Sequence, residues 1–77
     1  MPVRAYDVDG KAWRFDADAF RRMRARLRAS HADIAACVGV TRAAVSAWER
    51  GVCCPRAETV ETLVDMLGTT EFLRRMR

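Results

Sequence analysis

The segment SHADIAACVGVTRAAVSAWERG, residues 30–51, predicts two short helices separated by a glycine turn. Ser30 is a favoured N-cap residue, and Asp33 three positions later forms an imperfect capping box. Gly39 can adopt the left-handed conformation in which helices often end. Thr41 is a second N-cap, and a glycine again follows the helix that it opens. These signals predict helices over residues 30–38 and 41–50.

Both expected helices carry apolar residues at helical spacing. These residues are Ile34, Ala35 and Val38 in the first helix and Val45 and Trp48 in the second. Two short helices joined by a tight glycine turn have the dimensions of a helix-turn-helix, a motif that places its second helix in the major groove of DNA. We therefore treat the second helix as a candidate recognition helix.

Residues 3–15, VRAYDVDGKAWRF, predict a β-hairpin in front of the helices. Asp9-Gly10 suits a two-residue type I′ turn between two β-prone runs. Pairing outward from this turn sets Tyr6 opposite Trp13 and gives the hairpin one apolar, largely aromatic face. An isolated hairpin is marginal in water, so this face must be covered. It packs either on the helices of its own chain or on a partner, as a dimer contact or an accessory DNA arm.

Helical patterns also lie on both sides of the two short helices. From Asp16 onward, Phe20, Met23 and Leu27 recur at helical spacing. Another apolar stripe begins after Pro55 and stops at a glycine. Its members are Ala57, Val60, Leu63, Val64 and Leu67.

The end of the chain predicts one more short helix. Thr69 or Thr70 can cap it, and Phe72, Leu73 and Met76 would form its apolar face. The expected fold is therefore mainly α. It consists of an N-terminal β-hairpin extension over residues 1–15 and a five-helix domain over residues 16–77.

The chain is small and its positive charge is concentrated in the middle. Its 77 residues include 14 Lys and Arg against 10 Asp and Glu, for a net charge of +4. Residues 20–56 hold eight Arg against two acidic residues, a local charge of +6, whereas residues 1–19 and 57–77 each sum to −1. A patch of one sign steers a polyanion, and a basic domain passes the first screen for nucleic-acid binding.

Residues 18–68 resemble the lambda-repressor-like, Cro/Xre-type DNA-binding domain. The resemblance lies in a serine that opens the first short helix, Ile34-Ala35 in its middle, a Gly-Val-Thr turn and the ending Trp-Glu-Arg-Gly, followed by Pro55 and AETVETLVDMLG. An ordered set of spaced matches is more specific than any single one. The resemblance implies a helix-turn-helix fold with residues 41–50 in the major groove.

Individual roles follow from the same resemblance. The positions that reach base edges in the family correspond to Arg42, Ala43, Ser46 and Ala47. Phosphate contacts correspond to Ser30, His31, Arg50 and Arg56, although family members usually carry Gln at the histidine position. A structural ion pair between the first and third helices corresponds to Arg24 and Glu49.

These features predict a sequence-specific transcription regulator, most simply a repressor, that binds a palindromic operator in double-stranded DNA as a homodimer. One short helix reads few base pairs, so a second half-site is needed for typical specific affinity. The expected dimer surface is the last helix, with Phe72, Leu73 and Met76, and the hairpin is the second candidate. Two alternatives remain: an antitoxin that represses its own operon and holds a protein partner through the hairpin or the final helix, or an adaptor that binds only protein.

Other functions find little support in the sequence. His31 has no catalytic partners, so we expect no enzyme and no cofactor. Cys37 and the adjacent pair Cys53-Cys54 lack the ligand spacing of zinc sites, so we expect no metal. No apolar run approaches the span of a bilayer, and the N-terminus lacks a signal-peptide core. We therefore expect a soluble, cytoplasmic protein.

Overall fold

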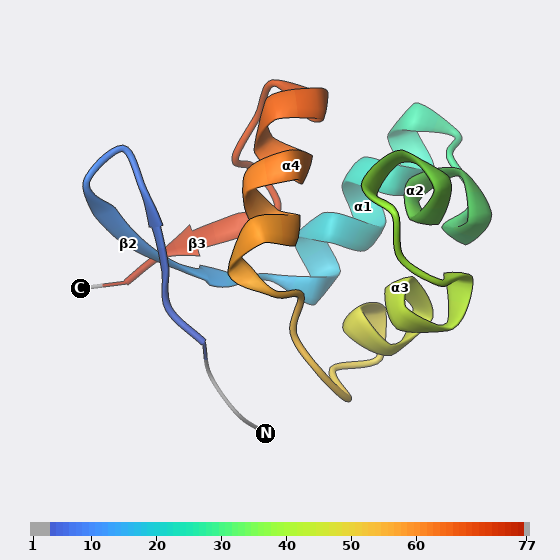
Figure 1. The fold of residues 1–77 in the computed structure, drawn as a ribbon, viewed down its shortest axis with the longest axis horizontal. Coiled ribbons are helices and arrows are strands. Elements are labelled where there is room, and N and C mark those ends of the chain that lie inside the picture. The colour runs from blue at the N-terminus through green and yellow to red at the C-terminus, as the bar shows by residue number, and fades with distance from the viewer. Residues whose placement is uncertain (1–3, 77) are drawn as a thin grey trace.

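The computed structural model describes residues 4–76 and contains four helices and one small sheet (Figure 1). In chain order the elements are β1 (Tyr6–Val8), β2 (Lys11–Phe15), α1 (Ala17–Leu27), α2 (His31–Val38), α3 (Arg42–Glu49), α4 (Ala57–Leu67) and β3 (Leu73–Arg75). The sheet lies at one end of the molecule and α2 with α3 at the other, and α1 and α4 lie between them.

The predicted hairpin is present with the predicted register. Tyr6 lies opposite Trp13 and Val8 opposite Lys11. Asp9 and Gly10 have φ values of 53° and 72°, as a type I′ turn requires at both central positions. The turn residues therefore favour this register locally.

The predicted fifth helix is wrong, because the end of the chain forms β3 instead. This strand pairs antiparallel with β2, with Leu73 opposite Phe15 and Arg74 opposite Arg14, and completes the sheet order β1-β2-β3. The N–H of Met76 donates to the carbonyl of Ala12 at 2.9 Å and extends the ladder. So short a helix is marginal in water, whereas a strand here gains hydrogen bonds from the open edge of β2.

Phe72 and Leu73 are not a dimer surface either. Their exposed fractions are 0% and 6%, because both pack into the core of their own chain, and Met76 is half-buried. Residues buried in this way cannot meet a second copy without unfolding the C-terminal strand. The predicted dimer surface depended on a helix at the end of the chain, and that helix does not form.

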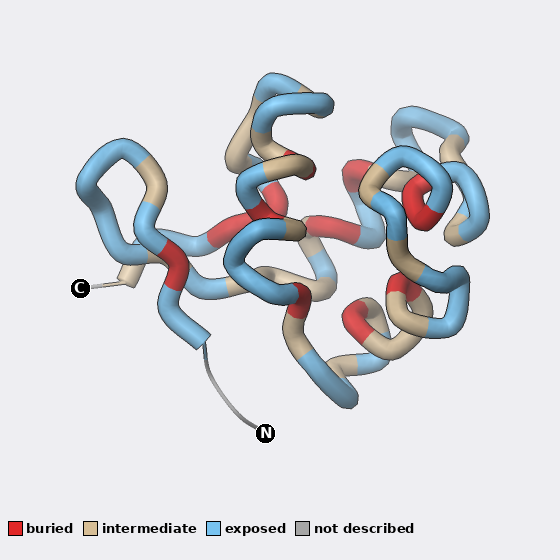
Figure 2. Tube along the Cα trace, viewed as in Figure 1, coloured by how far each residue is buried: buried red, intermediate tan, exposed pale blue. Residues whose placement is uncertain are grey.

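An aromatic cluster joins the sheet to the helices. The rings of Phe15, Phe20, Trp48 and Phe72 lie with their centroids 5.4 to 6.3 Å apart, in tilted or edge-on contacts. Such arrangements suit the ring quadrupoles. Figure 2 shows buried segments at the centre of the molecule, where α1 and α4 approach the sheet, and further buried segments in α2 and α3. The apolar face of the hairpin is thus covered by helices of its own chain.

Candidate nucleic-acid interface

Local hydrogen bonds define both helices of the helix-turn-helix. The Ser30 Oγ accepts from the N–H of Asp33 at 3.0 Å, and the Asp33 carboxylate accepts from the N–H of Ser30 at 2.8 Å, so the capping box is complete. Gly39 ends α2 with φ 72°, in the left-handed region. The Thr41 Oγ1 accepts from the N–H of Ala44 at 3.1 Å and caps α3. The chain therefore enters α3 at a defined angle.

The inner face of α3 is core and its outer face is open. Val45 and Trp48 are buried, with exposed fractions of 0% and 4%, and they pack in the same core as Ile34 and Ala35 of α2. The four residues predicted to contact bases share the other side of the helix at helical spacing. Of these, Arg42 and Ala43 are exposed, and Ser46 and Ala47 are half-buried.

Three arginines near α3 have no carboxylate partner in the part of the chain that the structure describes. They are Arg42 at its start, Arg50 at its end and Arg56 at the start of α4, and all three are exposed. Four arginines elsewhere are paired: Arg21 with Asp18, Arg24 with Glu49, Arg26 with Glu71 and Arg74 with Asp16. Five more exposed arginines also lack a carboxylate partner among the described residues: Arg4, Arg14, Arg22, Arg28 and Arg75. The three unpaired charges beside α3 are available to an external anion.

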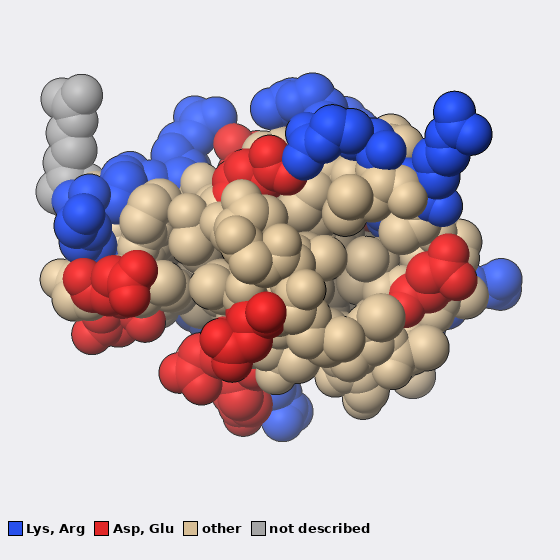
Figure 3. All heavy atoms as spheres, turned by 90° about the horizontal axis from the view of Figure 1, so that it is seen from above, with Lys and Arg blue, Asp and Glu red and all other residues tan. Residues whose placement is uncertain are grey.

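Charge is unevenly spread over the surface. On the face shown in Figure 3, basic side chains line one edge, and most acidic side chains lie away from that edge. The acidic residues of α4 are Glu58, Glu61 and Asp65, and all three are exposed. The exposed carboxylates of α4 repel an anionic partner, whereas the unpaired arginines at the two ends of α3 attract one.

The structure brings together the predicted pair Arg24 and Glu49. The Nε of Arg24 donates to Oε2 of Glu49 at 2.6 Å and its Nη2 donates to Oε1 at 3.0 Å, while its Nη1 donates to the carbonyl of Ala29 at 3.0 Å. Burial alone would raise the pKa of Glu49, but Arg24, with a further contribution from the nearby His31, outweighs it and lowers that pKa from 4.5. The pair fixes α1 to the C-terminal end of α3.

His31 points toward this pair rather than outward. Its Nε2 lies 3.3 Å from Oε1 of Glu49, is buried, and makes no hydrogen bond to any described residue. This nitrogen cannot reach a phosphate in this conformation, in contrast to the role that the resemblance implied. Ser30, the other predicted phosphate contact on α2, is exposed. Its hydroxyl accepts the capping bond and still has a proton to donate.

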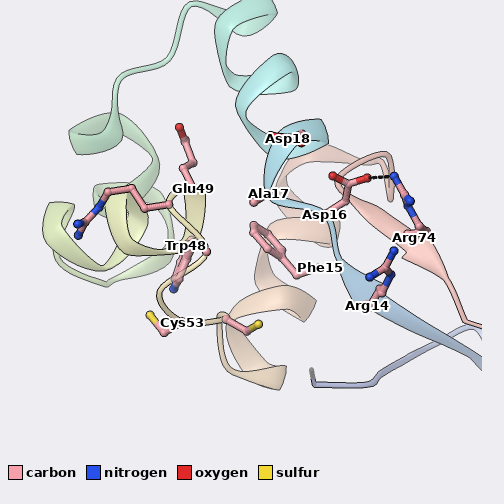
Figure 4. Close-up of a pocket in the computed structure, with 12 residues that line it drawn as sticks. Arg14, Phe15, Asp16, Ala17, Asp18, Trp48, Glu49, Cys53 and Arg74 are labelled. Carbon is pink, nitrogen blue, oxygen red and sulfur yellow. Dashed lines mark hydrogen bonds and ion pairs between the residues drawn. The ribbon is translucent and has the colours of Figure 1, made fainter. Parts of the chain in front are cut away.

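A cavity of about 400 Å³ lies between the end of β2, the first turn of α1 and the end of α3 (Figure 4). Phe15 and Trp48 face each other in it, and Arg74 reaches across to Asp16 at 2.9 Å. Cys53, from the loop after α3, lies below the two rings, and Cys54 also lines the cavity. Sequence reasoning missed this cavity, because its walls come from segments far apart in the chain.

Two short helices joined through a glycine turn, with the second exposing a face flanked by unpaired arginines, define a helix-turn-helix protein. The chain belongs to the helix-turn-helix domain family, whose model matches residues 17–77. No curated protein and no solved structure gives a match. Among residues 4–76, no helix has the length and apolar character needed to span a membrane.

Proposed function

We propose that the protein is a sequence-specific DNA-binding regulator of transcription, of the lambda-repressor-like, Cro/Xre type, with α3 in the major groove. The observation that carries this proposal is the open face of α3 together with the three unpaired arginines, Arg42, Arg50 and Arg56. A helix such as α3, with an open face and arginines at both ends, suits the major groove of DNA, which is about 12 Å wide and is bordered by phosphates.

Direct reading of bases falls mainly to Arg42. A guanidinium can bind the O6 and N7 of a guanine with two hydrogen bonds, which contributes roughly 1 to 3 kcal/mol of discrimination. The side chains of Ala43 and Ala47 have no hydrogen-bonding groups. They can contact thymine methyl groups, and their small size lets the helix approach the floor of the major groove closely. Ser46 can donate to or accept from a base edge.

Phosphate contacts would flank this helix on both sides. Ser30 at the start of α2 and Arg50 at the end of α3 are two of them. Arg56 is the third, and the helix that it opens has no side-chain cap. The first backbone N–H groups of α4 therefore remain unsatisfied donors at the positive end of a helix dipole, which favours an anion.

The regulator acts as a homodimer on a palindromic operator, most simply as a repressor in the cytoplasm, and without catalysis. With Phe72 and Leu73 in the core, the dimer uses other apolar groups. The candidates are the exposed large apolar residues Leu27, Val52 and Met66, with exposed fractions of 51%, 61% and 54%. Two-fold symmetry would place the second recognition helix one helical turn of DNA away.

The test is binding to a random-sequence DNA pool, followed by affinity measurements on the enriched site across a salt series. We expect enrichment of a two-fold-symmetric site and a steep loss of affinity as salt rises. Arg42→Ala should relax the preference at one position of each half-site, whereas Arg26→Ala, the same change on α1, should leave that preference intact. An absence of binding at low salt would favour the protein-binding adaptor, and a coexpressed protein that copurifies with the chain would favour the antitoxin.

A further inference from the structure

A buried hydrogen bond joins the N-terminal hairpin to the loop that follows the recognition helix. The hydroxyl of Tyr6 in β1 donates to the carbonyl of Pro55 at 2.5 Å, across 49 residues of sequence. Tyr6 is 3% exposed and Pro55 is fully buried. The bond therefore lies inside the protein, where competition from water is weak.

This bond fixes the orientation of the peptide unit between Pro55 and Arg56. No peptide bond in residues 4–76 is cis, so the carbonyl and the N–H of this unit point in opposite directions. Because the carbonyl of Pro55 points inward to Tyr6, the N–H of Arg56 points away from the hairpin. That N–H has no acceptor among the described residues, and Arg56 is exposed.

The donor that holds the peptide is itself held firmly. Burial raises the pKa of Tyr6 from 10.0 to about 12, and the nearby Cys54 adds to the effect, so the phenol remains a donor even at alkaline pH. The Nε1 of Trp13 donates to the carbonyl of Val8 at 3.1 Å and braces the two strands of the hairpin. The N–H of Asp16 donates to the carbonyl of Phe72 at 2.9 Å and joins the end of β2 to the segment before β3.

We infer that the hairpin is a positioning element for DNA binding: through Tyr6 it orients the loop so that Arg56 and the uncapped start of α4 face a DNA phosphate. The inference rests on the proposed function and assigns a role to a segment outside the helix-turn-helix family match. Tyr6 touches no DNA in this arrangement. It acts through the carbonyl of Pro55, and its loss removes the hydrogen bond that orients the neighbouring peptide.

The test is Tyr6→Phe, which removes one oxygen and keeps the ring in the core. Affinity for the selected DNA site should fall roughly three- to ten-fold, the effect of losing about one hydrogen bond of ordinary net strength. The plot of log affinity against log salt should become shallower by up to about 0.9, because one phosphate is no longer neutralised. Base preference should stay as in the wild type, because α3 is untouched.

Trp13→Phe is the matched control, since it removes a side-chain hydrogen bond within the same hairpin that does not reach the loop. A loss of stability alone lowers the fraction of active protein without changing the salt slope, so this variant should keep the wild-type slope. Arg56→Ala should lower the slope as Tyr6→Phe does, and combining the two should add little further, because both remove the same contact.

The outcomes separate the inference from the proposed function. A Tyr6→Phe protein with wild-type affinity and slope, or one that loses base preference at an unchanged slope, overturns the positioning role and leaves DNA binding in place. Full additivity of Tyr6→Phe and Arg56→Ala also overturns it. A wild-type protein that does not bind DNA overturns both.

Discussion

The guanidinium of Arg24 and the carboxylate of Glu49 meet side by side, with hydrogen bonds of 2.6 and 3.0 Å between α1 and the end of α3. The two side chains are 20% and 7% exposed, so the pair is largely shielded from water. The remaining donor of Arg24 binds the carbonyl of Ala29, just before α2. One side chain therefore ties together the three helices whose mutual angles set the direction of the recognition helix.

Arg24→Ala should destabilise the fold by roughly 3 kcal/mol, because it leaves the buried carboxylate of Glu49 without its partner. Urea unfolding followed by circular dichroism measures the change. Arg21→Ala is the control: it removes an equal charge from an exposed pair with Asp18, whose side chains are 56% and 68% exposed. Exposed pairs contribute little, so the control should stay within about 1 kcal/mol of the wild type. Equal decreases in the free energy of unfolding of the two variants would show that the shielded pair contributes no more to stability than the exposed pair.

Acid should weaken the fold partly through Glu49. Its pKa is lowered in the folded protein, so its contribution is fully present above its ordinary value of 4.5 and disappears as pH falls through the lowered pKa. Unfolding free energies of the wild type and Glu49→Gln, measured from pH 7 to pH 3, should therefore converge as the pH falls. Glu61→Gln, an exposed change on α4, should run parallel to the wild type. A gap between wild type and Glu49→Gln that stays constant with pH would contradict the assignment.

A bulky side chain on the open face of α3 should block the groove. Ala43→Leu is expected to lower DNA affinity at least ten-fold, a loss of about 1.4 kcal/mol, with little effect on stability, because Ala43 is exposed. Fluorescence anisotropy with the selected site measures it. Ala25→Leu places the same group on the exposed side of α1 and should bind as the wild type does. Unchanged affinity in Ala43→Leu would mean that another surface meets the DNA.

Phe72→Ala should cost about 3 to 5 kcal/mol, because the ring is completely buried in the aromatic cluster. Met66→Ala, at a residue that is 54% exposed, should cost much less. Thermal unfolding gives both values, and sedimentation of the folded fraction gives the oligomeric state. A small stability loss in Phe72→Ala with a clear shift from dimer to monomer would restore this residue to the dimer surface.

Helix and turn boundaries in the middle of the chain could be predicted from short stretches. Ser30 and Asp33 satisfy each other, Gly39 adopts the expected left-handed conformation and Thr41 caps α3. Each of these interactions spans at most four residues, so neighbours in sequence decide them. The same holds for the turn at Asp9 and Gly10, whose conformation the residues themselves prefer.

The same local rules gave the wrong structure for residues 69–76. Thr69 and Thr70 are acceptable caps, and Phe72 with Leu73 fit an apolar helical face. The strand that forms there depends on the free edge of β2, almost sixty residues earlier in the chain. The ion pair between Arg74 and Asp16 likewise joins residues 58 positions apart. Short-range preferences carry no information about such a partner, and tertiary hydrogen bonds overrode a weak helical tendency.

By itself the sequence determined where the two short helices begin and end, the hairpin turn, and which residues form the outer face of α3, because these depend on backbone preferences and on helical periodicity. Only the tertiary structure decided that the hairpin packs into the helical core, that His31 faces Glu49, and that Tyr6 binds the carbonyl of Pro55. Those contacts join segments distant in the chain, and their partners are chosen by the packing of the whole core.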